Sequence, residues 1–353
     1  MSPTGSQRPL VEKVRPLAQR ATLAAKGAAR RLAGTSLGHR AVSSLRTDPS
    51  PARLDEWLVP LFGDELSRIE GKIPGAGLDG YREFRDLDDD LWSLLLTKEY
   101  EAFPNIREFL PGHPDPSLQQ MWNGTSGTTL AAQSVCFYRK VKEMQATHGT
   151  GDLASTRILD FGCGWGRLTR MLAKDLEPGL LYGCDPVEDI LDVSRQTGVP
   201  AQLARSEFLP ETLPFEDKFD LVFSFSVFTH ISEAAHLASL KAIHDGLNPG
   251  GLFVVTVRPP AYIDFNPLMQ PAVDRLGPDR LQELRKPNYV FVPHHTEGHP
   301  QYDDAKDDPM SYGEAVITLP YIREKWAPMF DLIDVSVLTG DMYQVALTLR
   351  KAE

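Results

Sequence analysis

The chain has 353 residues, of which 42% are hydrophobic, 24% charged and 9% aromatic, and its formal net charge is −11. Its length suits one large domain or two compact ones, and its composition is that of a globular protein, which excludes wholesale disorder and fibrous repeats. Since no apolar run approaches the roughly 18 residues that a bilayer-spanning helix needs, we do not expect a transmembrane protein.

Charge divides the chain near residue 50. Residues 1–50 hold nine Lys or Arg against two acidic residues, a net charge of +7, which leaves −18 for residues 51–353. Because so acidic a body repels phosphate backbones, we expect no nucleic-acid partner. The three cysteines, Cys136, Cys163 and Cys184, lack CxxC spacing. This disfavours a disulfide framework or a zinc site and indicates a reducing, cytoplasmic compartment.

Residues 1–50 are expected to form a basic, flexible tail. Between Pro16 and Leu32, small apolar residues recur at helical spacing among arginines and lysines. Three interpretations remain open: a mostly disordered tail, an amphipathic helix that makes peripheral contact with an anionic membrane, and an organelle transit peptide.

Residues 51–149 are predicted to form a helical cap. One helix is expected over 53–69, kinked or divided by Pro60, and a second over 88–103, opened by three aspartates. A third is expected from an N-cap at Thr128 to about Met144. The turn at 122–127 that precedes it could close over a ligand or belong to the core.

From about residue 156, apolar strands alternate with helical segments. Strands are predicted at 157–161, 180–184, 220–225 and 252–257, with helices beginning near Arg167, Val187 and Ser232. This alternation is typical of a parallel sheet with helices on both faces. The polar stretch 259–311 is either a functional lid or carries elements of its own. A helix at 319–326 and strands at 331–337 and 343–349 are expected to follow.

The most informative motif directly follows the first of these strands. It reads Asp160-Phe161-Gly162-Cys163-Gly164-Trp165-Gly166-Arg167, and its glycines let the backbone turn tightly and a ligand approach closely. A dinucleotide fingerprint would need a small residue where Arg167 stands, which disfavours a nicotinamide oxidoreductase. Asp185 ends the next strand, where a carboxylate can accept hydrogen bonds from both hydroxyls of a ribose.

These segments resemble the motifs of class I S-adenosylmethionine-dependent methyltransferases. Asp185 matches the ribose-binding acid, Phe219 to His230 the region after the fourth strand, and 247–251 the turn before the fifth. The resemblance covers about 156–258 and 316–350. It implies an α/β, Rossmann-like fold with a seven-stranded, mostly parallel sheet and a reversed last hairpin. The domain would span 150–353, with a lid at 259–315 inserted between the fifth and sixth strands.

The resemblance also implies S-adenosylmethionine as the cofactor. Asp160 would hold its aminoacyl end, Gly162 and Gly164 would line its methionine portion, and Glu207 or Phe208 would contact adenine, although the segment 204–209 departs from the family's usual pattern. The residues expected at the cofactor are Asp160, Gly162, Cys163, Gly164, Gly166, Asp185, Glu207, Phe208 and Ser226.

Two groups of residues are candidates for the methyl acceptor. His230 follows the fourth strand at the carboxyl edge of the sheet and is the predicted general base, with a structural role as the alternative. The residues expected to bind substrate are His294, His295, His299, Tyr302 and Tyr312. A solvated loop and a metal site are the alternatives for this stretch, but the spacing matches no zinc signature and no metal is predicted.

These observations predict O-methylation of a hydroxylated small molecule or a glycan. The polar lid suits hydroxyl groups, and a basic tail at a membrane would suit a lipid-linked glycan. N-methylation, which needs no base, and a non-catalytic scaffold with the same fold are the alternatives.

Overall fold

The computed structural model describes residues 51–294 and 312–352. The chain divides into two compact units, Met1–Trp57 and Leu58–Glu353, and the fold described below is that of the second. The tail predicted at 1–50 lies outside the described residues. Within these residues, no helix combines the length and the apolarity that crossing a bilayer would require.

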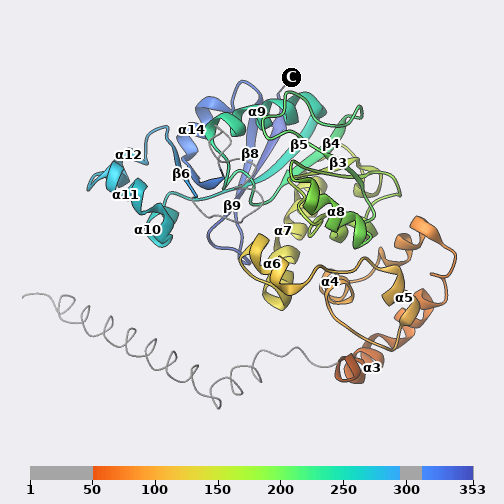
Figure 1. The fold of residues 1–353 in the computed structure, drawn as a ribbon. Helices are drawn as coiled ribbons and strands as arrows, with labels where there is room; N and C mark the ends of the chain where they lie inside the picture. Colours follow the sequence, from red (N-terminus) through yellow and green to blue (C-terminus); the bar gives the residue numbers. More distant parts are fainter. Residues whose placement is uncertain (1–50, 295–311, 353) are drawn as a thin grey trace, which may run out of the picture. The chain divides into compact units, whose positions relative to one another are not determined.

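A seven-stranded sheet forms the centre of this unit (Figure 1). Its strands run in the order β3-β2-β1-β4-β5-β9-β8, parallel from β3 to β5 and antiparallel on both sides of β9. They are β1 (Ile158–Phe161), β2 (Leu181–Asp185), β3 (Gln202–Arg205), β4 (Phe219–Ser224), β5 (Leu247–Val257), β8 (Phe330–Val337) and β9 (Val345–Lys351). The predicted mostly parallel sheet with a reversed last hairpin is therefore confirmed.

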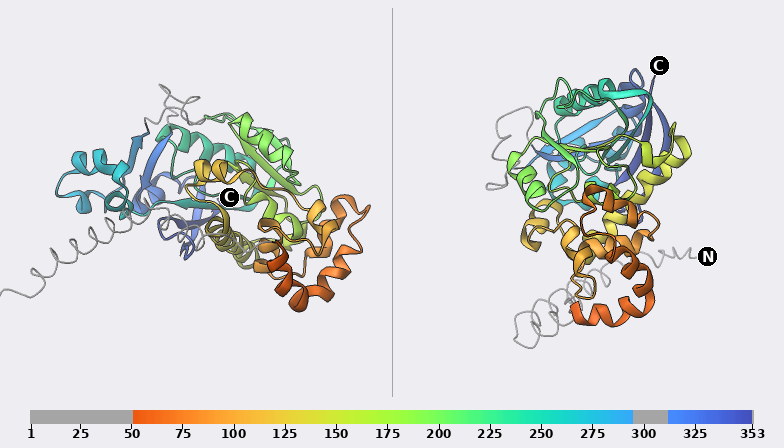
Figure 2. Two further views of the ribbon diagram at one scale, coloured as in Figure 1. Left: turned by 60° about the horizontal axis from the view of Figure 1, so that its bottom comes forward. Right: turned by 90° about the vertical axis from the view of Figure 1, so that its right-hand side faces the viewer.

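Helices cover both faces of the sheet, as Figures 1 and 2 show. On one face, α9 (Glu233–Gly246) and α14 (Leu319–Lys325) share a core with alternate residues of the central strands. On the other face, α7 (Gly127–His148) and α8 (Glu188–Gln196) meet in a cluster around Trp165. Because both faces are covered, β1 and β2 are buried at every residue, which explains why their sequences are apolar runs.

The segment before the sheet is helical, but several predicted boundaries are wrong. The first helix, α3 (Pro51–Glu70), continues through Pro60, so the predicted division does not occur. The helix opened by Asp88, α4 (Asp89–Thr97), ends well before residue 103 because the backbone is extended at Lys98. The N-cap of α7 is Ser126 instead of Thr128. The remaining elements are η1 (Gly77–Phe84), α5 (Pro104–Phe109), α6 (Pro116–Asn123) and η2 (Leu153–Ser155).

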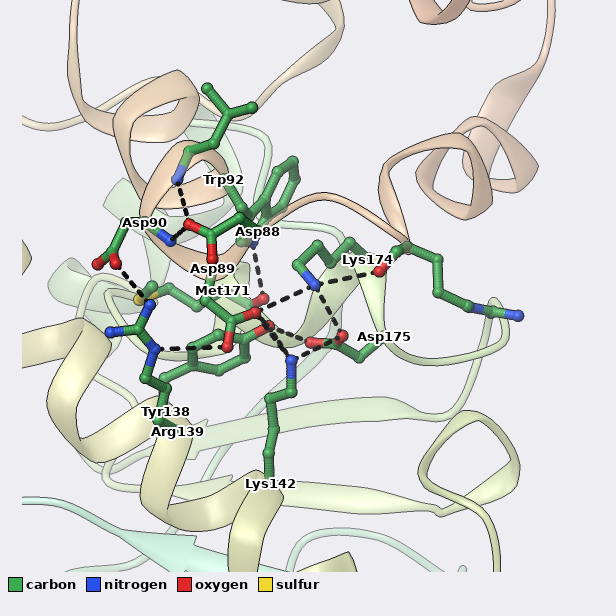
Figure 3. A network of polar contacts seen from close by, with 12 residues as sticks. Asp88, Asp89, Asp90, Trp92, Tyr138, Arg139, Lys142, Met171, Lys174 and Asp175 are labelled. Carbon is green, nitrogen blue, oxygen red and sulfur yellow. Dashed lines mark hydrogen bonds and ion pairs between the residues drawn. The ribbon is translucent and has the colours of Figure 1, made fainter. Parts of the chain in front are cut away.

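A buried polar network, which we call the junction network, connects α4 and α7 to the end of η3 (Thr169–Lys174) (Figure 3). Lys174 Nζ lies 3.0 Å from Asp175 Oδ1 and 3.3 Å from Asp89 Oδ1. Lys142 Nζ lies 2.8 Å from Asp89 Oδ1 and 3.3 Å from Asp175 Oδ1, and the hydroxyl of Tyr138 donates to both carboxylates. These five side chains fix the helical segment to the sheet domain.

The polar stretch after β5 carries elements of its own, which was one of its two predicted interpretations. They are α10 (Tyr262–Phe265), η4 (Pro267–Met269), α11 (Gln270–Leu276), α12 (Arg280–Glu283) and β6 (Tyr289–Pro293). Strand β6 pairs in antiparallel fashion with β7 (Gly313–Ile317). These two strands, which follow β5 in the chain, form a second, two-stranded sheet. A lid function for this stretch stays a prediction.

Candidate functional site

A cavity of about 860 Å³ opens at the carboxyl edge of the parallel strands. It is lined by the segments that follow β1, β2, β4 and β5, by the end of α6, by the β6–β7 hairpin and by the turn between β8 and β9. The chain leaves β1 and β4 in opposite directions, and open α/β sheets bind ligands at such a switch point. The cavity is therefore the candidate ligand site.

The glycine loop after β1 forms one wall. Gly164 has φ +53°, and a Cβ placed on it would meet no atom within 4 Å, so this backbone is bare toward the cavity. Gly166 has φ +75°, but a Cβ there would lie 2.7 Å from Ser194 Oγ and from Val199 Cγ2. Gly164 thus leaves room for a ligand, whereas Gly166 lets the loop pack against its own domain and does not line the cavity.

Asp185, the last residue of β2, lies in the cavity wall with its carboxylate held by the backbone. Its Oδ2 accepts from Gly164 N at 2.9 Å and its Oδ1 from Val187 N at 3.0 Å. Burial raises the pKa of Asp185 to about 6, so the group is ionised near neutral pH. Each oxygen keeps a lone pair, and this pair of acceptors fits a ribose diol.

Asp160 lies on the neighbouring strand and also lines the cavity. Its Oδ2 accepts from Thr169 Oγ1 at 2.6 Å, and the side chain is buried without an ion-pair partner among the described residues. Burial raises the pKa of Asp160 to about 7. The Thr169 hydrogen bond and the Arg167 charge oppose this rise, and a cationic ligand would stabilise the ionised form further, which fits an ammonium group.

The other residues predicted at the cofactor are spread around this wall. Cys163, Phe208 and Ser226 line the cavity, and Ser226 has a left-handed backbone with φ 63°. Glu207 is exposed and does not line it. Burial raises the pKa of the Cys163 thiol well above its usual value, so this cysteine is a small apolar contact and not a nucleophile.

His230, the predicted base, lies in the cavity with both ring nitrogens engaged. Nδ1 is 2.7 Å from the Gly313 carbonyl, and since a carbonyl only accepts, Nδ1 carries the proton. Nε2 then accepts from Arg258 Nη2 at 3.0 Å. Burial and the Arg258 charge lower the pKa of His230 to about 4. The ring is neutral at pH 7 but its lone pair is in use, so this geometry does not favour the predicted role as base.

Glu314, on β7, organises the far wall of the cavity. Its Oε2 lies 3.0 Å from Arg258 Nε and accepts from the Tyr262 hydroxyl at 2.9 Å, while its Oε1 lies 3.2 Å from His294 Nε2. Burial alone would raise the pKa of Glu314, but His294, His230 and Arg258 outweigh burial and lower it to about 2. Glu314 is therefore an anion that holds several side chains in place.

Two of the five predicted substrate residues lie in the cavity wall. His294 lines it beside Glu314, and the ring of Tyr312 stacks on that of His230 with centroids 4.9 Å apart. His295, His299 and Tyr302 lie outside the described residues. Across 51–294 and 312–352, no three His, Cys, Asp or Glu side chains are grouped as in a metal site.

Several cavity residues were missed by the sequence analysis. Arg258 follows β5 directly, as Asp185 ends β2, and this position at the carboxyl edge was a usable signal. Gln133 on α7 and Asp341 and Gln344 in the β8–β9 turn gave no such signal, because only the tertiary fold brings them to the cavity. Residues 122–125 also line it, which agrees with one of the two interpretations of that segment, although Trp122 and Asn123 belong to α6 and not to a turn.

Comparison with known proteins identifies the domain. Residues 158–251 match the family model described as a methyltransferase domain, which covers the glycine loop, Asp185 and the strands β1 to β4. A search of the curated proteins gave no significant match.

Solved structures with a similar fold include three methyltransferases. An S-adenosylmethionine-dependent methyltransferase from Mesorhizobium loti is 16% identical over 62% of this chain and 98% of its own, with a TM-score of 0.41. Another from Clostridium acetobutylicum is 13% identical over 67% and 97%, with a TM-score of 0.44. Magnesium protoporphyrin IX methyltransferase from Synechocystis is 13% identical over 67% and 93%, with a TM-score of 0.42.

The assignment rests on the family match, on the strand order and on the cavity. In the cavity, the glycine backbone leaves room for a ligand, Asp185 can accept hydrogen bonds from a ribose diol, and Asp160 can accept an ammonium group. These features fit a nucleoside with an amino-acid end. The chain therefore contains a methyltransferase domain at residues 158–251, and the cavity fits S-adenosylmethionine as its cofactor.

Proposed function

We propose that this enzyme methylates a hydroxyl group of a small molecule or a glycan. The proposal is based on a polar part of the cavity wall, where Arg258, Tyr262, His294, Tyr312 and Glu314 contact one another. The cofactor, when bound, supplies an electrophilic methyl group on a sulfonium. The protein must then orient a hydroxyl toward that methyl group and take up its proton.

His294 is the better candidate for proton uptake. Its Nε2 faces the ionised Glu314 at 3.2 Å, and a carboxylate on one imidazole nitrogen leaves the other nitrogen as the proton acceptor. His230 differs because its acceptor nitrogen already takes a hydrogen bond from Arg258. In this proposal His294 is the general base, and His230 positions Arg258 and Tyr312.

The outer rim of the cavity supports an acceptor with an apolar portion. Three apolar side chains line the cavity and are more than half exposed: Met121 (54%), Phe265 (64%) and Tyr343 (51%). The ring centroids of Phe265 and Tyr343 are 5.8 Å apart. Exposed apolar side chains that cluster at the opening of a site favour ligands with an apolar part. Such an acceptor agrees with the lipid-linked glycan and the peripheral membrane contact predicted from residues 1–50, and with a cytoplasmic location.

Matched acceptors test the proposal. The enzyme is incubated with methyl-labelled S-adenosylmethionine and with octyl β-glucoside, methyl β-glucoside or the 2-amino-2-deoxy counterpart of each, as members of a wider panel of hydroxylated and amino compounds. We expect label on oxygen, faster transfer to the octyl than to the methyl compounds, and loss of transfer in His294→Asn with retained cofactor binding.

Three results would contradict parts of the proposal. Label on nitrogen, unaffected by His294→Asn, would support N-methylation. Tight cofactor binding without turnover on any acceptor of the panel would support a scaffold. Equal rates for octyl and methyl glucosides would exclude a role of the apolar rim.

A further inference from the structure

Arg258 belongs to the polar part of the cavity wall and is held rigidly there. It directly follows the last residue of β5 and is 8% exposed. Its Nε lies 3.0 Å from Glu314 Oε2, and its Nη2 donates to His230 Nε2 at 3.0 Å. Its Cζ lies 3.9 Å from the centre of the Tyr262 ring. These three contacts fix the plane of the guanidinium.

Arg258 has more hydrogen-bond donors than these contacts use. A guanidinium carries five N–H groups in a rigid, planar arrangement. Nη1 carries two of them and has no hydrogen-bond partner among residues 51–294 and 312–352. Nη1 also keeps accessible surface, and the residue lines the cavity. Donors of Arg258 are therefore available to a bound molecule.

The available donors favour an acidic molecule over a neutral one. Within the described part of the chain, Glu314 is the one carboxylate within 4.0 Å of this guanidinium, and it is shared with Tyr262 and His294. Two neighbouring N–H groups of a guanidinium match the two oxygens of a carboxylate, and hydrogen bonds between charged groups are stronger than neutral ones.

The same glutamate connects Arg258 to His294, the proposed base. Oε2 of Glu314 lies at Arg258 Nε, and Oε1 lies 3.2 Å from His294 Nε2. A carboxylate bound to Arg258 and a hydroxyl group bound to His294 would therefore occupy neighbouring positions of one molecule.

We propose that Arg258 determines acceptor specificity by binding a carboxylate of the acceptor, so that the enzyme methylates hydroxy acids, for example a glycan with a uronic acid. This inference rests on the proposed function, because it takes the acceptor to lie against the polar part of the cavity wall. Arg258 binds and orients the acceptor and takes up no proton.

Titration calorimetry with two sugars tests the inference on the full chain saturated with S-adenosylhomocysteine. Methyl β-glucuronide carries a carboxylate where methyl β-glucoside carries a hydroxymethyl group. Since hydrogen bonds between charged groups are strong, we expect the wild type to bind the glucuronide about 10- to 100-fold more tightly than the glucoside. In Arg258→Met this ratio should fall to one or below, because Glu314 then repels the carboxylate. Arg258→Lys keeps the charge but loses the planar donors, so its ratio should be intermediate.

Arg280→Met is the matched control. Arg280, on α12, pairs with Asp264 at 2.9 Å and does not line the cavity, so its replacement should leave the ratio unchanged. Because each ratio is taken within one variant, a general loss of stability or of cofactor binding cancels. Should Arg258→Met fail to fold, Arg258→Lys gives the same comparison.

Three outcomes would overturn the inference. They are equal affinities for the two sugars in the wild type, an unchanged ratio in the Arg258 variants, and tighter binding of methyl glucoside 6-phosphate than of the glucuronide, which would assign Arg258 to a phosphate. Binding is measured without turnover, so it is independent of the proposed function. Label on nitrogen would contradict O-methylation while a glucuronide preference stands, whereas O-methylation of both sugars with equal affinities would contradict the role of Arg258 alone.

Discussion

The molecule contains two buried polar clusters that look alike in composition but face different surroundings. In the junction network, Lys142 and Lys174 lie between Asp89 and Asp175, and none of the four lines the cavity (Figure 3). In the cavity cluster, Arg258, Glu314, His230 and His294 contact one another and all line the cavity. The Lys174 side chain is 1% exposed and that of Glu314 is 5%. Both clusters thus bury charged side chains, and only the contact of the second cluster with the cavity marks it as a site.

The largest effect that separates the two regions is expected at His294. If His294 is the base, His294→Asn should lower the methyl-transfer rate by about 10²- to 10⁴-fold, because this is the usual contribution of general base catalysis. The melting temperature should change little, since His294 lies at the cavity edge. Rate and melting curve are measured on the same preparation. A rate within twofold of wild type would remove His294 from catalysis, and His230→Asn would then be the next variant to measure.

The opposite pattern is expected at Lys174. Lys174→Met removes one member of a buried ion-pair group and leaves its carboxylates with less positive charge, which costs about 3 to 5 kcal/mol of unfolding free energy. Denaturant unfolding measures this loss, and titration with S-adenosylhomocysteine should show unchanged affinity in the folded variant. A loss of affinity larger than the loss of stability would mean that the junction network acts on the site.

A smaller change should come from Tyr138→Phe. The hydroxyl donates to Asp89 and Asp175, and loss of a hydrogen bond to a charged group costs about 1.5 to 3 kcal/mol. Both lysines remain, so the carboxylates stay neutralised. We expect a lower denaturation midpoint with unaltered turnover, whereas a neutral substitution would show that these hydrogen bonds add nothing to the ion pairs.

The smallest effect is a pH dependence that only the cavity should show. Burial raises the pKa of Asp160 to about 7, so this group gains a proton as the pH falls through neutrality. An ammonium ligand favours the ionised form, so S-adenosylhomocysteine should bind about tenfold more weakly at pH 6 than at pH 8 and release protons on binding near pH 7. Titration calorimetry in buffers of different ionisation enthalpy measures both quantities. In Asp160→Asn the profile should be flatter, and an equally steep profile there would assign the titration to another group.

Local patterns predicted the central fold well. The apolar runs at β1, β2 and β4 are buried strands, Ser232 caps α9, and the glycine loop and Asp185 line the cavity as expected. These features depend on neighbouring residues and on the common position of parallel strand ends. By contrast, Gln133, Asp341 and Gln344 reach the cavity from distant segments. Their roles depend on long-range packing, which no short sequence window encodes.

Hydrogen-bond partners were equally hidden. The sequence marks His230 as a titratable residue at the right edge of the sheet, but it does not reveal that Arg258 and Gly313 occupy its two nitrogens. Likewise the sequence gives no sign that Glu314 binds Arg258, Tyr262 and His294 in the wall of the cavity. The identity of a side chain is thus readable from sequence, whereas the availability of its lone pairs is a property of the fold.

The position of β9 has a consequence for biosynthesis. This strand is the most C-terminal in the sheet, yet it lies inside it between β5 and β8, and the turn before it delivers Asp341 and Gln344 to the cavity. During translation the earlier strands must wait, with one edge of β5 unpaired, until residues near 350 have left the ribosome. Nascent chains should therefore acquire cofactor affinity late and abruptly, and chaperone demand should be greatest just before that moment.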